Sequence, residues 1–183
     1  MNLNVDKILI IGLGMIGSSI ALASKSKGIK VYGFDKSNNS IKEALEKNII
    51  DSKVESIEDI NSKDFVKKVD LIIIAVPPKQ TLDVLNDLKE IWNTDVTITD
   101  TSSVKNHIKL SDASNIVLSH PIAGSDQSGI SAANGDLFKN KKNVLCDPFN
   151  SKKGHFEKVD NFWKNALQMR TSSMSVTEHD LIF

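Results

Sequence analysis

Short apolar runs alternate with amphipathic stretches along this chain. Most of the runs are continuous, as is typical of parallel strands that are covered by helices on both faces. The runs predict six strands, at residues 7–12, 30–34, 70–76, 96–99, 115–119 and 143–146. Apolar residues at helical spacing predict helices at residues 15–27, 39–47, 79–92, 104–110 and 155–166. The regular alternation of the two patterns predicts a doubly wound α/β fold with a mostly parallel sheet.

Three glycines follow the first predicted strand and open the first predicted helix. Gly12, Gly14 and Gly17 have the spacing G-x-G-x-x-G within the stretch "ILIIGLGMIG". In such a motif the first glycine permits a tight turn, the second lets backbone approach a pyrophosphate, and the third lets helix pack on strand. The helix N-terminus adds free N–H groups and partial positive charge. We therefore expect a Rossmann-type dinucleotide site. The predicted contacts in this turn are Gly12, Leu13, Gly14, Met15, Ile16 and Gly17.

An acidic residue ends the second predicted strand. Asp35 lies 18 residues after Gly17 and follows "VYGF". A carboxylate there can accept hydrogen bonds from the adenosine ribose hydroxyls. It would also repel a 2′-phosphate, which favours NAD over NADP, although the neighbouring Lys36 weakens that preference. The alternative is that the glycines only tighten a turn and that Asp35 caps the next helix.

The carboxyl ends of parallel strands meet at one edge of a sheet, where ligands of such folds bind. The loop after the third predicted strand carries Val76, Pro77 and Pro78, which form either a wall beside the nicotinamide or a sharp turn. The loop after the fourth carries Ser102 and Ser103. Either serine could cap the helix expected to follow, contact a ligand, or do both.

Of the four histidines, His120 is the candidate for chemistry. It directly follows the fifth predicted strand at the ligand edge, and Pro121 restricts the chain direction there. A neutral imidazole can accept a proton near pH 7, as oxidation of an alcohol requires. The alternative is a hydrogen-bonded histidine with a packing role. His107 and His155 lie in predicted surface helices and are expected to face solvent.

Composition restricts the class of protein. At 183 residues the chain suits one well-buried domain and is too short for two ordinary ones. Lys and Arg balance Asp and Glu at 23 each, so charge gives no reason to expect nucleic acid or an anionic membrane. One cysteine, no leader-like start and no apolar run near the length of a membrane span suggest a water-soluble cytoplasmic protein. No metal site is expected.

The chain resembles the nucleotide-binding domain of the prephenate/arogenate (cyclohexadienyl) dehydrogenase family. The "HPIAGS" stretch is the most specific similarity, because many dehydrogenases share the glycine motif. The matching stretches are "IGLGMIGSSIA" at 11–21, "VYGFD" at 31–35, "AVPP" at 75–78, "DTSSVK" at 100–105, "HPIAGSDQSG" at 120–129, "LF" at 137–138 and "MSVTEHDLIF" at 174–183.

This resemblance implies oxidation of the ring alcohol of prephenate or arogenate by NAD(P), with loss of the ring carboxylate as the ring becomes aromatic, in tyrosine biosynthesis. His120 matches the catalytic histidine that hydrogen-bonds the ring hydroxyl and takes its proton. Ser103 matches a serine that holds the same hydroxyl. Ser125 and Asp126 occupy substrate-side positions where the family has Thr and Glu. His179, in "EHD", is expected to position or gate substrate, or to be a structural interface residue.

The resemblance also implies a second domain, which is all-helical, builds a homodimer, closes the pocket and supplies an arginine for the substrate carboxylate. The expected division is 1–173 for the Rossmann domain and 174–183 for the start of the helical domain. The chain ends at Phe183, inside the expected first helix. Weak turnover by the chain alone is therefore expected, together with uncovered apolar surface on that helix.

Three other functions are compatible with the sequence. One is a different dehydrogenase of this fold, such as a β-hydroxyacid dehydrogenase or a pyrroline-carboxylate reductase, for which "HPIAGS" would not be expected. Another is a non-catalytic NAD-sensing module, and the last is an inactive remnant. The sequence does not decide between prephenate and arogenate.

Overall fold

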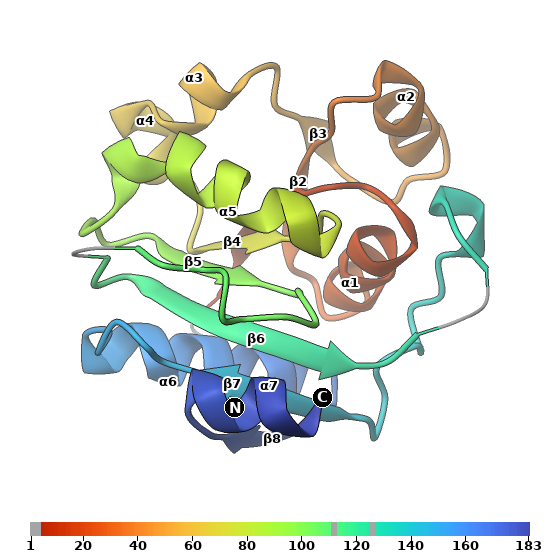
Figure 1. Ribbon diagram of the computed structural model, residues 1–183. Coiled ribbons are helices and arrows are strands. Elements are labelled where there is room, and N and C mark those ends of the chain that lie inside the picture. The colour runs from red at the N-terminus through yellow and green to blue at the C-terminus, as the bar shows by residue number, and fades with distance from the viewer. Residues whose placement is uncertain (1–4, 111–112, 125–126) are drawn as a thin grey trace.

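An eight-stranded sheet forms the centre of the molecule (Figure 1). The computed structural model describes residues 5–110, 113–124 and 127–183. The strand order is β3-β2-β1-β4-β5-β6-β7-β8, and all neighbouring pairs are parallel except β6 and β7. The strands are β1 (Lys7–Ile11), β2 (Lys30–Phe34), β3 (Ser52–Lys53), β4 (Leu71–Ile74), β5 (Thr97–Asp100), β6 (Ile116–Ile122), β7 (Lys142–Cys146) and β8 (Arg170–Ser173).

Helices cover both faces of this sheet. They are α1 (Met15–Lys25), α2 (Asn38–Glu46), α3 (Ile57–Ile60), α4 (Lys63–Val66), α5 (Pro78–Asp87), α6 (Lys153–Asn161) and α7 (Val176–Ile182). Short 3₁₀ turns form η1 (Lys89–Ile91) and η2 (Ile130–Ala132), and a π-helical turn, η3 (Phe162–Ala166), continues α6.

Alternate residues of β1 belong to two separate cores. Ile8 and Ile10 pack in a core with residues of α1, α2 and α6, whereas Leu9 and Ile11 pack in a core with residues of α3, α4 and α5. Strands buried on both faces need apolar residues at successive positions, which explains the continuous runs in the sequence. The predicted fold class, a Rossmann-type sheet with helices on both faces, is therefore confirmed.

The predicted helix at residues 104–110 is wrong, since this segment forms a turn and irregular chain. Its backbone donors have side-chain partners instead. The Val104 N–H donates to Ser102 Oγ, and the N–H groups of Lys105 and Asn106 donate to the Asp180 carboxylate. Such bonds compete with helix formation. The Lys105 side chain is also fully buried, which a surface helix would not allow.

His107 and His155 were predicted to lie on surface helices and face solvent, and this prediction is wrong for both. His155 is in α6 but only 8% exposed, and its Nδ1 lies 2.7 Å from Thr97 Oγ1. His107 is partly buried outside any helix, and its Nε2 donates to the Pro78 carbonyl at 3.0 Å. The prediction failed because a buried hydrogen bond lets a polar side chain occupy an inward-facing position.

The registers place the predicted ligand-edge loops together. Ile11 at the end of β1 pairs with Phe34 and with Ile74, and Ile74 pairs with Asp100. The glycine turn, the prolines and the loop after β5 therefore open on one edge, as predicted. Strand order reverses between β1 and β4, which is the switch point where ligands of such sheets bind. His120 lies within β6, which continues two residues beyond it.

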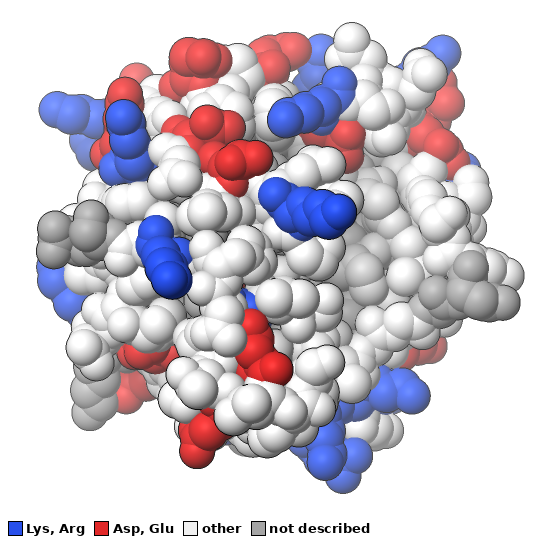
Figure 2. Space-filling model, viewed as in Figure 1, with Lys and Arg blue, Asp and Glu red and all other residues white. Residues whose placement is uncertain are grey.

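Charged side chains are scattered over the face seen in Figure 2, with basic and acidic groups interspersed. This distribution agrees with the balanced composition and shows no basic patch on that face. Within the described ranges, none of the helices combines the length and hydropathy that a membrane-spanning segment needs.

Candidate functional site

The turn between β1 and α1 is held in place by contacts that only glycine allows. Gly12 has φ +97°, and a Cβ built there would lie 2.6 Å from the Ala75 carbonyl oxygen. A Cβ on Gly17 would lie 1.9 Å from the Gly12 carbonyl oxygen, so helix and turn meet closely there. Gly14 differs, because no atom lies within 4 Å of its Cβ position. The turn is therefore rigid but open at Gly14.

Gly14 is also the N-cap of α1, and no side chain hydrogen-bonds the cap there. The first N–H groups of a helix lack partners within the helix and carry partial positive charge. Since Gly14 is exposed, these donors can receive an anionic group from outside the protein. This geometry fits the predicted pyrophosphate site.

Asp35 connects the end of β2 to the glycine turn. Its Oδ2 accepts the Leu13 N–H at 2.7 Å, and its Oδ1 accepts the Ser37 N–H at 2.8 Å. The N-cap of α2 is Ser37, whose side chain accepts the Ser40 N–H, so Asp35 does not itself cap that helix. A carboxylate offers about four lone-pair sites. Asp35 thus retains capacity to accept hydroxyl protons while holding the turn.

A hollow of about 250 Å³ lies at the switch point between β1 and β4. Five of the residues predicted to contact the cofactor line it, namely Gly12, Gly14, Asp35, Val76 and Pro77. Phe34, Ile57, Gln80 and Val84 also line it and were missed by sequence reasoning. Their spacing carries a weak signal, since Gln80 and Val84 lie four residues apart on one face of α5.

The other five predicted contacts lie in the same loops but do not line this hollow. Leu13 is buried in the core, Gly17 packs against the turn, and Met15 and Ile16 begin α1 half-buried. Pro78 is the first residue of α5. The structure therefore separates residues that face the hollow from residues that support it.

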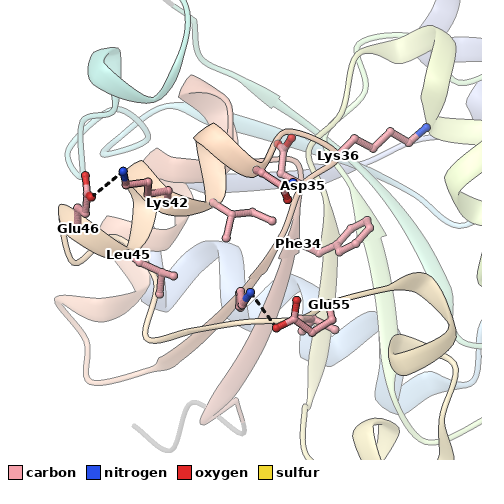
Figure 3. Close-up of a pocket in the computed structure, with 11 residues that line it drawn as sticks. Phe34, Asp35, Lys36, Lys42, Leu45, Glu46 and Glu55 are labelled. Atoms are coloured by element: carbon pink, nitrogen blue, oxygen red, sulfur yellow. Dashed lines mark ion pairs between the residues drawn. The ribbon is translucent and has the colours of Figure 1, made fainter.

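A wider hollow of about 840 Å³ opens between α2 and the segment after β3 (Figure 3). It shares Phe34, Asp35 and Lys36 with the smaller hollow but contains no residue of the glycine turn. In Figure 3, Lys42 and Glu46 pair with each other along α2. Asp35 thus lies where the two hollows meet, and only the smaller one reaches the N-terminus of α1.

His120 begins a chain of hydrogen bonds at the same edge of the sheet. Its Nδ1 lies 2.8 Å from Nε2 of the buried His179, and His179 Nδ1 lies 2.6 Å from Asp180 Oδ1. The Phe183 ring packs edge-on against His120, with 5.4 Å between ring centroids. Three strand spacings separate β1 from β6, which is about 14 Å. The hydrogen-bonded series His120–His179–Asp180 therefore lies beside the smaller hollow rather than in it.

The order of these hydrogen-bonded groups determines where the protons lie when both imidazoles are neutral. A carboxylate only accepts, so His179 Nδ1 carries the proton that it shares with Asp180. The Nε2 of a neutral His179 is then an acceptor, and His120 Nδ1 must be the donor. This leaves His120 unprotonated at Nε2, which is the tautomer that can accept a proton from a ligand. His179, which is fully buried, orients His120 from behind.

The electrostatic surroundings determine the charge of the two ends of this hydrogen-bonded series, His120 and Asp180. Burial is the largest reason that the pKa of His120 falls from 6.5 to about 4, and the positive charge of Lys105 acts in the same direction. Burial alone would raise the pKa of Asp180, but hydrogen bonds from Asn106, His179 and Lys105 outweigh it and lower that pKa. Near pH 7, His120 is therefore neutral and Asp180 ionised.

Of the remaining predicted substrate residues, the structure describes Ser103. Ser103 is exposed in the loop after β5, at the edge that His120 shares. The buried Ser102 makes the turn there, with its Oγ bonded to the N–H and carbonyl of Val104. Ser125 and Asp126 lie outside the described residues. Sequence reasoning missed Asp180, although it stands beside His179 in "EHD".

A mostly parallel sheet with a glycine turn and a hollow at its switch point defines a nucleotide-binding domain of the Rossmann type. Residues 20–168 match the family model described as "Prephenate dehydrogenase, nucleotide-binding domain". The chain belongs to this family. The expectation drawn from the sequence motifs is confirmed at that level.

Individual relatives agree with the family. The chain is 36% identical to prephenate dehydrogenase of Bacillus subtilis, over 98% of this chain and 49% of that protein. It is 38% identical to prephenate dehydrogenase of Lactococcus lactis, over 78% of this chain and 41% of that protein. It thus spans about half the length of these curated relatives or less.

A solved structure extends the similarity to three dimensions. All of this chain aligns with 64% of a prephenate dehydrogenase chain from A. aeolicus, with a TM-score of 0.87 and 29% identity. That crystal structure holds hydroxyphenyl propionate and NAD⁺. The fold is therefore shared over the whole of this chain.

Proposed function

We propose that this chain is the nucleotide-binding part of an NAD-dependent enzyme that oxidises and decarboxylates prephenate, arogenate or both in tyrosine biosynthesis. The observation that carries the proposal is the chain from His120 through His179 to Asp180, which leaves a proton-accepting nitrogen at the ligand edge. Family membership supports it, because the relatives are named prephenate dehydrogenases.

The described residues fit NAD. The open backbone at Gly14 would receive the pyrophosphate, and Asp35 would accept hydrogen bonds from the ribose hydroxyls while disfavouring the 2′-phosphate of NADP. Val76, Pro77 and Pro78 would line the path toward the nicotinamide. Bound NAD supplies the acceptor for a hydride. The NAD⁺ in the A. aeolicus structure supports this assignment.

The proposed chemistry at His120 is proton transfer. His120 Nε2 accepts the proton of the ring hydroxyl as the hydrogen on the same carbon leaves with its electron pair. The imidazolium formed keeps its Nδ1–H bond to His179, and the Asp180 carboxylate behind His179 offsets part of its positive charge. The carbon–carbon bond to the ring carboxylate then breaks, CO₂ leaves, and its electron pair completes the aromatic ring. The proton held by His120 returns to the ring oxygen.

We also propose roles for the other residues that were predicted to contact substrate. Ser103 would hold the ring hydroxyl beside His120, and Ser125 and Asp126 would contact the rest of the substrate. His179 would act on substrate through His120, because its side chain is fully buried.

We also propose the division into a Rossmann domain at 1–173 and the start of a helical, dimer-forming domain at 174–183. The second segment forms α7, which begins with a capping box between Ser175 and Glu178. Its last residues are apolar and exposed, with Leu181 at 81% and Ile182 at 65%. A covering domain would bury them, and slow turnover is expected from this chain alone. The proposed location is cytoplasmic, as the sequence suggested.

The test measures NAD binding and NADH formation separately. His120→Asn should leave the NAD dissociation constant unchanged and lower turnover of prephenate or arogenate by about 10²- to 10⁴-fold, because general base catalysis is lost. His155→Asn is the matched control, since it removes a buried histidine hydrogen bond away from the site. Turnover that survives His120→Asn would contradict the proposed role.

A non-catalytic NAD-sensing module is the second candidate. The observation that favours it is that residues of this chain form the whole lining of the smaller hollow, which does not include His120. Tight NAD binding with no turnover of either substrate, even with a supplied C-terminal domain of a relative, would select the sensor over the enzyme.

A further inference from the structure

A buried ion pair lies directly beneath the His120 chain. Asp100 is the last residue of β5, and Lys105 follows in the loop after it. Both side chains are fully buried, and Lys105 Nζ lies 2.6 Å from Asp100 Oδ2. Burying two charges costs desolvation, and apolar side chains of similar size often stabilise a fold as well or better. The presence of this pair therefore indicates a task other than stability.

The pair is bonded to the residue immediately before His120. Asp100 Oδ1 accepts the Ser119 N–H at 2.9 Å, and Lys105 Nζ donates to the Ser119 carbonyl at 2.6 Å. The paired register of β5 and β6 reaches only from Ile98 and Ile116 to Thr99 and Val117. Where the two strands separate, the side-chain pair thus supplies the bonds that the neighbouring strand no longer makes.

The same segment also holds the imidazole chain from its other end. The N–H groups of Lys105 and Asn106 donate to the Asp180 carboxylate, at 2.7 to 3.1 Å. Asp180 in turn bonds His179, which bonds His120. One short loop therefore fixes His120 twice, through the preceding peptide and through its ring.

We propose that Lys105 and Asp100 are positioning residues for His120, which clamp the Ser119 peptide so that the imidazole points at the ligand edge. The inference rests on the base role proposed above for His120. Neither side chain could touch substrate itself, because both are fully buried. Their effect must pass through the backbone of Ser119 and through the charge of the pair.

The charges of the pair act on the pKa of His120. This pKa is a measurable property that a purely structural role of the pair would leave unchanged. Among the described residues, the charged or titratable groups that act on His120 are Lys105, His179, Asp100 and Asp180. After burial, Lys105 has the largest effect, and it lowers the pKa of His120. Removal of the pair should raise that pKa, because the lowering by Lys105 outweighs the raising by Asp100, and because water then reaches a less firmly held imidazole.

The test is an NMR pH titration of the His120 ring in the 183-residue chain, with its signal assigned by loss in His120→Asn. The double variant Asp100→Leu with Lys105→Met removes both charges and leaves neither unpaired. We expect it to fold, to bind NAD within about twofold of the starting chain, and to titrate at His120 at least about half a pH unit higher. This measurement needs no turnover, so it can fail or succeed independently of the proposed reaction.

Ser119→Ala is the matched control. It removes a hydroxyl bonded to Thr99 and Trp163 but keeps the clamped peptide, so the His120 midpoint should not move. A midpoint that is unchanged in the double variant, or that moves equally in Ser119→Ala, would overturn the proposal. If the double variant does not fold, Lys105→Gln replaces it, because this change keeps an N–H donor and removes the charge. The midpoint should again rise, and a constant value would overturn the proposal.

Discussion

Asp35 shows how one side chain can serve structure and recognition together. It holds the glycine turn through the Leu13 N–H and still has lone pairs for ribose hydroxyls. Asp35→Ala should therefore weaken NAD binding by about tenfold, as expected for loss of hydrogen bonds to a charged group, and should weaken NADP binding less. Isothermal titration with both nucleotides measures this difference.

Glu46→Ala is the control for Asp35, because Glu46 lines only the wider hollow. If NAD occupies the smaller hollow, this change should leave both dissociation constants unaltered. An equal loss of NAD affinity in Glu46→Ala would place the nucleotide in the wider hollow and contradict the assignment of Asp35.

At the scale of elements, we expect two glycines of the β1–α1 turn to have different roles, since Gly17 is needed for folding and Gly14 for binding. A methyl group on Gly17 would collide with the Gly12 carbonyl, whereas one on Gly14 would meet open space. Gly17→Ala should therefore cost the fold several kcal/mol or prevent folding, as overpacking and backbone shifts do. Gly14→Ala should keep the melting temperature and weaken NAD binding at least about tenfold, because its Cβ would occupy the pyrophosphate path. Thermal unfolding and NAD titration of both variants provide the test, and the same loss of stability in both would contradict it.

The elements also show which features the sequence could predict. The runs around Ile8–Ile11 and Ile72–Ile74 predict strands because a sheet covered on both faces needs apolar residues in succession. β8 reads "RTSS", partly exposed, and has no such signal. The segment 104–110 has helical spacing, yet side-chain partners far along the chain, above all Asp180, take its N–H groups. Spacing reports local preference and does not report a partner 75 residues away.

The candidate site, like the fold, could be predicted only in part from the sequence. The glycine turn and Asp35 could be located because each follows a strand that ends at the ligand edge, and His120 could be located because it lies near the carboxyl end of β6. The tautomer of His120 could not be predicted from the sequence, because it depends on a contact between β6 and α7 that only folding creates. The buried state of Lys105 was equally hidden, since lysine is ordinarily a surface residue.

At the scale of the whole molecule, buried histidines make stability depend on pH. The pKa of His120 is about 4 in the folded protein and near 6.5 in the unfolded chain, and burial lowers the pKa of His155 as well. Between these two values the unfolded chain binds more protons than the folded one, so acid favours unfolding. The stabilisation from His120 is complete above about pH 6.5 and is lost as the pH falls toward 4, at no more than about 1.4 kcal/mol per pH unit.

Denaturant unfolding between pH 7.5 and 4.5 (about the range in which histidine titrates) measures this slope. His120→Asn should flatten it, since the variant has no imidazole to protonate on unfolding, while the slope due to His155 remains. The effect should persist in high salt, because burial rather than screened surface charge is the main cause. An equal slope in both proteins would mean that His120 is protonated in the fold, and it would then have no lone pair with which to begin the proposed reaction.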